Sequence, residues 1–253
     1  MQGVLALDRV TVRDADFSRA AFERFAPNGC VFERCDFRGE LFDERLQTLF
    51  ASRRQSIFRE CRFDGADLHA VRPGQARFES CNFARTNIDG WISACAEFVD
   101  CTFSGPVRNV TFHGKPWGHA AERIDPVRGA NAFTGNDFTK ADLIGVLFVN
   151  GINVQAQLWP KGDTYVVIDR IHQRATRARA LILDWKDHEA RNEALAMLQQ
   201  VAFVFIHQSG VATPRADDRW PATPENQRKV WETLEAVLEI GRASCRERVS
   251  LTV

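Results

Sequence analysis

The chain has 253 residues, no net charge, 45% hydrophobic residues and 26% charged residues. This length is sufficient for a sizeable core and for more than one domain. The sequence contains no long apolar run and no secretory apolar segment near its start, so we expect a cytoplasmic protein without membrane association.

The dominant feature is a phrase, Phe-x-x-Cys-x-Phe, that recurs at a spacing of twenty residues. Its copies are Phe32-x-x-Cys35-x-Phe37, Phe58-x-x-Cys61-x-Phe63, Phe78-x-x-Cys81-x-Phe83 and Phe98-x-x-Cys101-x-Phe103. The first copy precedes the second by 26 residues, and weaker copies begin at Val12 and Phe133. A fixed period of this length predicts stacked structural units.

Within each repeat, a large apolar residue returns every five positions, and a small residue stands two positions before it. Neither a helix nor a strand has a period of five. The pattern instead predicts a chain that turns a corner every five residues and completes one coil in twenty. The predicted core contains Phe32, Phe37, Phe58, Phe63, Phe78, Phe83, Phe98 and Phe103, with Cys35, Cys61, Cys81 and Cys101 at the small inward positions.

Several of these segments resemble the pentapeptide-repeat family, whose pattern is approximately A-(D/N)-(L/F)-x-x. The matching segments are Ala15-Asp16-Phe17-Ser18-Arg19, Cys35-Asp36-Phe37-Arg38-Gly39, Ala66-Asp67-Leu68, Cys81-Asn82-Phe83 and Ala141-Asp142-Leu143. The resemblance covers residues 3–153 and implies an all-β domain, a right-handed quadrilateral β-helix of about six coils. We therefore expect residues 1–153 to form this solenoid.

The cysteines do not have the spacing of a metal site. Metal-binding cysteines usually occur in several pairs separated by two to four residues, whereas the sequence has one pair with such a spacing, Cys30 and Cys35, and both fall at the small inward position. We interpret the four core cysteines as small apolar residues. Cys95 lies outside the pattern and is the candidate reactive thiol.

One side of the predicted coil is irregular. Its inward positions are degraded, and two insertions, near 43–57 and 105–131, lie beside it. Insertions in a repeat protein often gather on the binding face. The candidate partner-binding residues are Arg53, Arg54, Arg72, Trp91, Lys115, Trp117 and Arg123. The alternative is that Trp117 folds back as a lid over this side.

The pattern changes from residue 154 onward, where apolar residues take helical spacing. One amphipathic helix is predicted by an apolar face made of Ile171, Ala175, Ala178, Ile182 and Trp185. Residues 189–208 are apolar over much of the circumference and predict a second helix that is buried. Residues 209–222 are expected to be a loop, and Thr223-Pro224 is a helix start. We expect 154–238 to form a small α-helical cap or a dimerisation region that could support a homodimer. Residues 239–253 are interpreted as a non-native tail and are left out of the fold prediction.

The sequence contains no catalytic motif and gives no reason to expect a cofactor, a metal ion or direct nucleic-acid binding. We therefore predict a non-enzymatic interaction scaffold that binds a protein partner of unknown identity. The family resemblance implies an alternative, a DNA mimic that binds DNA gyrase or a related topoisomerase and gives fluoroquinolone resistance. Such mimicry requires an acidic rod, whereas residues 1–155 contain almost equal numbers of basic and acidic residues.

Overall fold

The computed structural model describes residues 2–39 and 53–249, and only the backbone of residues 2–4, 21–24 and 238–249. The predicted insertion 43–57 therefore lies outside the described residues up to residue 52. The chain divides into two compact units, Met1–Lys161 and Gly162–Val253. The predicted boundary at residue 153 was eight residues too early.

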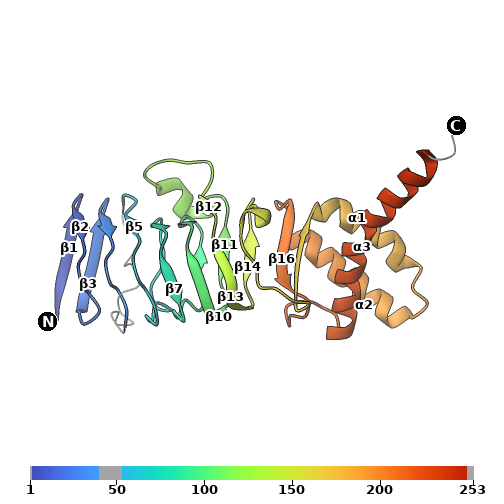
Figure 1. Ribbon diagram of the computed structural model, residues 1–253, viewed down its shortest axis with the longest axis horizontal. Coiled ribbons are helices and arrows are strands. Elements are labelled where there is room, and N and C mark those ends of the chain that lie inside the picture. Colours follow the sequence, from blue (N-terminus) through green and yellow to red (C-terminus); the bar gives the residue numbers. More distant parts are fainter. Residues whose placement is uncertain (1, 40–52, 250–253) are drawn as a thin grey trace. The chain divides into compact units, whose positions relative to one another are not determined.

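Unit 1 is built from short strands (Figure 1). They are β1 (Gln2–Asp8), β2 (Thr11–Arg13), β3 (Ala21–Asn28), β4 (Val31–Glu33), β5 (Ile57–Arg59), β6 (Arg77–Glu79), β7 (Asn82–Ala84), β8 (Ile92–Ser93), β9 (Glu97–Val99), β10 (Thr102–Arg108), β11 (Thr111–His113), β12 (Phe133–Thr134), β13 (Asp137–Ile144) and β14 (Leu147–Val149). Two 3-10 helices, η1 (His119–Arg123) and η2 (Val154–Ala156), complete the unit.

All strand pairs described in unit 1 are parallel. The largest sheet has six strands in the order β12-β9-β6-β5-β4-β2, and two further sheets have the orders β13-β10-β7 and β14-β11-β8. Equivalent residues of successive repeats pair directly, as Phe58 does with Phe78 and Phe78 with Phe98. The chain therefore returns to the same sheet in each repeat, because parallel neighbours require a connection that leads back to the starting edge.

The core consists of phenylalanine rings stacked in columns. In one column, Phe83 lies between Phe63 and Phe103, with ring centroids 5.1 Å apart on each side and planes 7° from parallel. In a second column, Phe58 stacks on Phe32 at 4.8 Å. Every phenylalanine and cysteine of the predicted core is at most 1% exposed. Stacked aromatic pairs contribute stability beyond that of their buried area, so the columns stabilise the repeats both by apolar burial and by ring stacking.

The corners of the coil require an unusual backbone conformation. Arg34, Glu60, Ser80 and Asp100 occupy equivalent corners, and all have φ between 51° and 54°. This left-handed conformation costs about 1–2 kcal/mol for a residue with a Cβ. Each of these residues donates its backbone N–H to the following coil, as Ser80 does to the Val99 carbonyl at 2.8 Å. The inter-coil hydrogen bonds compensate for the local strain.

The second predicted insertion begins later than residue 105. Strands β10 and β11 extend through residue 113, where Val107 pairs with Leu143 and Phe112 pairs with Phe148. Phe112 is fully buried and stacks on Phe148 with centroids 5.3 Å apart. The prediction was wrong here because Val107 follows Phe103 by four residues instead of five, which hides the repeat in the sequence.

The last turn of unit 1 runs to Trp159. The Trp159 ring stacks on Phe138 with centroids 5.2 Å apart, and its Nε1 donates to the Val154 carbonyl at 2.7 Å. Gln157 is buried and donates to the Phe133 carbonyl at 3.0 Å. These residues continue the stacking beyond the recognisable repeat, which explains the later boundary.

Unit 2 contains three helices and a small antiparallel sheet. The elements are β15 (Tyr165–Asp169), α1 (Ile171–Leu183), α2 (His188–Val204), β16 (Gly210–Pro214) and α3 (Pro224–Val249), and β15 pairs with β16. The predicted all-helical region was therefore wrong in two places, since β16 occupies part of the expected loop and β15 precedes the first helix. The β-branched run Val166-Val167-Ile168 is the signal that could have predicted β15.

Helix boundaries in unit 2 follow capping chemistry. The Asp187 side chain accepts from the backbone N–H groups of Glu189 and Ala190 at the start of α2. Thr223 caps α3 as predicted, with its hydroxyl 3.4 Å from the Asn226 nitrogen. The expectation that residues 189–208 form a buried helix was wrong at its C-terminal end, because α2 ends at Val204 and Phe203 and Ile206 are 77% and 57% exposed. The backbone of α3 is helical through Val249, and its course does not test whether 239–253 is a non-native tail.

The stacked columns make a direct prediction about stability. Phe83→Ala should lower the free energy of unfolding by about 3–5 kcal/mol, because it removes a ring that contacts both neighbouring coils. Ile92 is 61% exposed in the same unit, so Ile92→Ala is the matched control and should cost less than about 1 kcal/mol. Chemical denaturation monitored by circular dichroism measures both changes. A loss below about 1 kcal/mol for Phe83→Ala would contradict the column.

Candidate functional site

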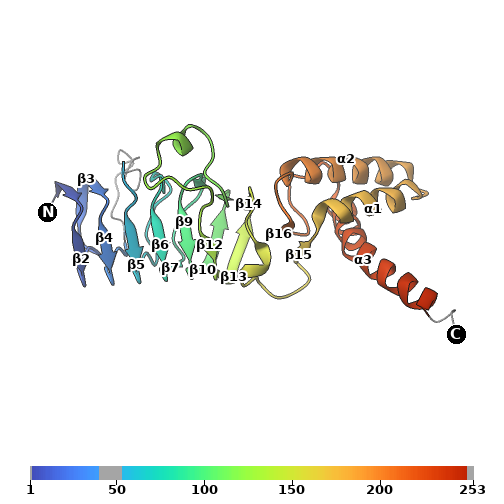
Figure 2. The same ribbon diagram turned by 90° about the horizontal axis from the view of Figure 1, so that it is seen from above.

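The second insertion forms a loop, residues 114–130, that stands on one side of unit 1 (Figure 2). It leaves the coil after β11, contains η1 and returns at β12. The loop contains Lys115, Trp117 and Arg123, three of the predicted partner-binding residues. The contacts that hold it decide whether it presents these side chains in a defined arrangement.

Glu97 anchors the end of the loop. Its side chain is 5% exposed and lies 3.5 Å from the Arg128 guanidinium and 3.4 Å from that of Arg77. It also accepts hydrogen bonds from Gln55 and from the Ala132 backbone, both at 2.8 Å. A buried carboxylate is tolerated only with such partners, so the loop return and the charge network stabilise each other.

The middle of the loop is tied to the end of the first insertion. The Asp125 backbone N–H donates to Gln75 Oε1 at 2.9 Å, and its carbonyl accepts from the Gln55 N–H at 2.8 Å. The Asp125 carboxylate also lies 3.3 Å from Arg54 Nε. The segment that follows the first insertion and the second insertion therefore lie on the same side of unit 1.

A hollow of about 620 Å³ lies between the loop and the coils. It is lined by Arg53, Gly74, Gln75, Cys95, Ala120, Arg123 and Ile124. Arg53 and Arg123 are exposed, and neither forms an ion pair with any of the residues that the structure describes. Two guanidinium groups without carboxylate partners can bind an anionic group.

Trp117 lies at the beginning of the loop and is 57% exposed. Its ring stacks on His113 with centroids 5.2 Å apart, and its backbone N–H donates to the Ala94 carbonyl at 3.2 Å. Burial lowers the pKa of His113, and the Asn150 amide lies 2.8 Å from its Nδ1. The neutral imidazole, with Nδ1 as acceptor, therefore provides a fixed platform for the indole.

Trp91 does not belong to the exposed side, and its prediction as a partner-binding residue was wrong. It is 2% exposed, and its Nε1 donates to the Leu68 carbonyl at 2.8 Å. The physical reason for its burial is the small residue nearby. Ser93, two residues after Trp91, pairs with Phe112 of the next coil, so a serine stands where the next coil has a phenylalanine. We infer that Trp91 fills the space that the small Ser93 side chain leaves.

The remaining candidates are exposed but separate. Lys115 is exposed and its side chain lies beside Gly151 in the last coil, whereas Arg53 and Arg123 line the hollow with Gly74. Arg72 is also exposed. The structure therefore brings together Arg53, Arg54 and Arg123 and does not form one cluster of all seven candidates.

The cysteines are buried in the coil. Cys61, Cys81 and Cys101 each direct their thiol toward a phenylalanine carbonyl of the preceding coil, at 3.2–3.5 Å. Burial raises the pKa of Cys81, and it also raises the pKa of Cys95, the candidate reactive thiol. Within residues 2–39 and 53–249, no group of three or more His, Cys, Asp or Glu side chains is arranged to hold a metal ion.

An alternating ladder of charges runs along the largest sheet, and the sequence analysis missed it. Arg13, Glu33, Arg59 and Glu79 pair in register on successive strands. Their ion-pair distances are 2.6, 3.1 and 2.8 Å. The signal was present as opposite charges at one position of successive repeats. This face therefore has no continuous acidic stripe.

No family model matches this sequence, and no curated protein matches it. Among solved structures, a trypsin-treated form of QnrB1, a plasmid-mediated fluoroquinolone resistance protein, is 14% identical with a TM-score of 0.27, over 62% of this chain and 79% of that one. Full-length QnrB1 is 14% identical with a TM-score of 0.20, over 61% and 82%. These scores are too low to support an argument, so the description of the fold rests on the strand pairing itself. No helix in the described part of the chain is long and apolar enough to cross a bilayer.

The base of the loop makes a prediction about Gly114. A Cβ at this position would lie 2.5 Å from the Ile152 nitrogen, so Gly114→Ala must displace the backbone of the last coil. Gly129 lies in the same loop, and a Cβ added there would have nothing within 4 Å, which makes Gly129→Ala the control. Thermal unfolding should show a clear loss for Gly114→Ala, of about 1–3 kcal/mol, and little change for Gly129→Ala. Equal melting temperatures would show that the loop base is looser than described.

Burial also predicts the reactivity of the thiols. Site-resolved mass spectrometry after iodoacetamide treatment of the native chain should show slow labelling of Cys35, Cys61, Cys81, Cys95 and Cys101 and fast labelling after unfolding, because the reagent cannot reach these buried side chains in the native chain. For Cys81 and Cys95, burial also raises the pKa and so disfavours the reactive thiolate. Cys245 lies outside the described side chains and does not enter the comparison. Rapid native labelling of Cys95 would mean that the hollow opens in solution.

Proposed function

We propose that unit 1 is a right-handed quadrilateral β-helix of the pentapeptide-repeat type and that the chain is a non-enzymatic interaction scaffold. The in-register parallel pairing at the repeat period supports the architecture. The loop side, defined as Arg53, Arg54, Trp117 and Arg123, supports the function. Its arginines and its exposed indole are side chains that often dominate protein interfaces.

The observation that carries this proposal is the anchored loop. Glu97, Gln75 and Gln55 bind its middle and end, so the loop is ordered without help from a partner. Arg53 and Arg123 remain without a carboxylate partner among the described residues, at the rim of the hollow. A protein surface with an acidic group would supply the missing partner, and the exposed part of Trp117 would add apolar contact.

The state of the carboxylates and thiols in unit 1 supports the non-enzymatic part of the proposal. Several of these carboxylates are held in arginine pairs along the coil, as Glu33 and Glu79 are. The thiol that lines the hollow has a raised pKa, which is the opposite of an activated nucleophile.

The alternative, a DNA mimic that binds DNA gyrase, fits the charge pattern less well. DNA presents a regular row of negative charges, whereas the ladder from Arg13 to Glu79 alternates in sign. A gyrase supercoiling assay with titrated protein discriminates the two functions. The scaffold predicts no change in supercoiling, and concentration-dependent inhibition would favour the alternative.

The scaffold proposal is tested with the double variant Trp117→Ala/Arg123→Ala. It should lose capture of the partner from a native host extract, while its melting temperature stays within about 2 °C of the parent because both side chains are largely exposed. The control is Glu122→Ala/Val127→Ala, which changes two exposed residues of the same loop. Undiminished capture by the first variant would contradict the proposal, and a large drop in its melting temperature would instead identify the loop as a structural lid.

A further inference from the structure

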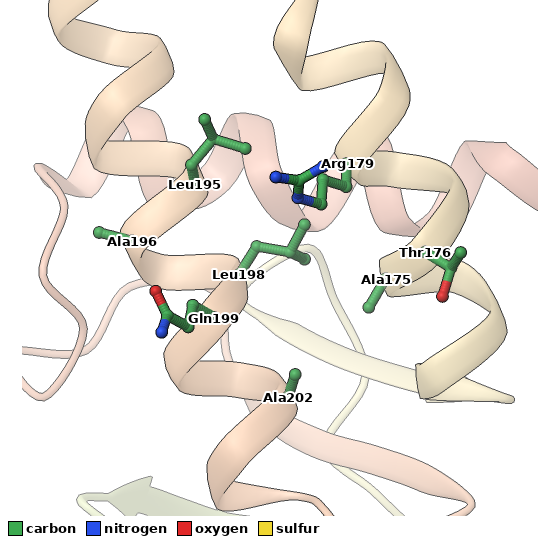
Figure 3. Close-up of a pocket in the computed structure, with 8 residues that line it drawn as sticks. All are labelled: Ala175, Thr176, Arg179, Leu195, Ala196, Leu198, Gln199 and Ala202. Carbon is green, nitrogen blue, oxygen red and sulfur yellow. The ribbon is translucent and has the colours of Figure 1, made fainter.

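A second surface lies in unit 2, between helices α1 and α2 (Figure 3). The two helices form a hairpin, and a groove of about 560 Å³ lies between them. Its lining consists of Ala175, Thr176, Arg179, Leu195, Ala196, Leu198, Gln199 and Ala202. Three of these residues are alanines, whose small side chains leave the room that forms the groove.

The α2 wall of the groove is uncharged. Between Glu193 and Arg215 the sequence contains no Asp, Glu, Lys or Arg, although charged residues make up 26% of the chain. Gln199 and Phe203 are four residues apart on α2, so they lie on the same side of the helix, and Ile206 follows in the turn after α2 ends at Val204. Phe203 is 77% exposed and Ile206 is 57% exposed, and clustered apolar exposure of this kind marks an interaction surface.

The α1 wall is positively charged. Helix α1 contains Arg174, Arg177 and Arg179 and no acidic residue. Arg174 is neutralised by Asp169, 2.7 Å away. Arg179 forms no ion pair with any described residue, and its side chain extends from α1 toward α2 at the rim of the groove (Figure 3). The groove thus presents one uncharged wall and one cation that forms no ion pair within the described part of the chain.

We propose that this groove binds an amphipathic α-helix of a partner protein. The apolar stripe of that helix packs on Ala196, Gln199 and Phe203, and an acidic side chain beside the stripe pairs with Arg179. A helix fits because the groove runs along two helices and is open to solvent, which is the geometry of helix-in-groove recognition. The charge sign selects the partner, since a basic helix would meet Arg179 without a counter-charge. The site is independent of the loop side of unit 1.

The test uses two designed helical peptides with the same leucine stripe, one with Glu and one with Lys at the flanking position. Fluorescence anisotropy of the labelled peptides with the full chain should show binding of the Glu peptide at least about fivefold tighter than that of the Lys peptide. Arg179→Glu should reverse this order. Arg177→Glu is the matched control, because Arg177 is exposed on the same helix but does not line the groove, and it should preserve the order.

Two further measurements separate the possible outcomes. Ala202→Phe, which fills the groove, should abolish binding of both peptides, with circular dichroism to verify that the helices are retained. The double variant Trp117→Ala/Arg123→Ala should bind the peptides as the parent does. The groove proposal and the loop-side proposal can therefore fail independently of each other. Absence of peptide binding would overturn the proposal. Self-association of the chain that Arg179→Glu disrupts, without peptide binding, would assign the groove to a second copy instead.

Discussion

In-register stacking of parallel strands is the constraint on which the rest of unit 1 depends. Because equivalent residues of successive repeats pair directly, the side chains at one repeat position lie beside one another on neighbouring strands. Phenylalanine stacks on phenylalanine with centroids about 5 Å apart, and cysteine lies below cysteine at the small positions. The same constraint aligns exposed charges, so opposite signs must alternate along the sheet to avoid repulsion. A change at one repeat position therefore affects two neighbouring coils.

The anchored loop shows how an interruption of such a coil is accommodated. An inserted segment exposes backbone groups of the coils on either side, and these groups need partners. Asn131 provides two of them by donating to the Ala94 and His113 carbonyls at 3.1 and 2.9 Å. Glu97 provides others through its contacts with Ala132 and Arg128. The insertion is thus part of the folded structure.

The two units use the same side-chain chemistry for different surfaces. On unit 1, Arg53 and Arg123, which form no ion pair with the described residues, line a hollow beside the loop that carries the exposed Trp117. On unit 2, Arg179, which likewise forms no ion pair with the described residues, lines a groove beside the uncharged residues of α2. Each unit also contains an arginine that does form an ion pair. Arg128 pairs with Glu97 in unit 1, and Arg174 pairs with Asp169 in unit 2.

The sequence by itself determined the in-register stacking of the repeats, because a five-residue period within a twenty-residue repeat indicates which side chains are buried. The positions of Phe63, Phe83 and Phe103, the helix face from Ile171 to Ile182 and the cap at Thr223 follow from local spacing and capping chemistry. Only the tertiary structure decided that Trp91 is buried, that β10 and β11 continue the coil and that β15 pairs with β16. The physical reason is that these outcomes depend on neighbours far apart in the chain. Trp91 fills space left by a small residue, Phe112 finds its register against Phe148, and α2 stays partly exposed because the described residues cover only one of its faces.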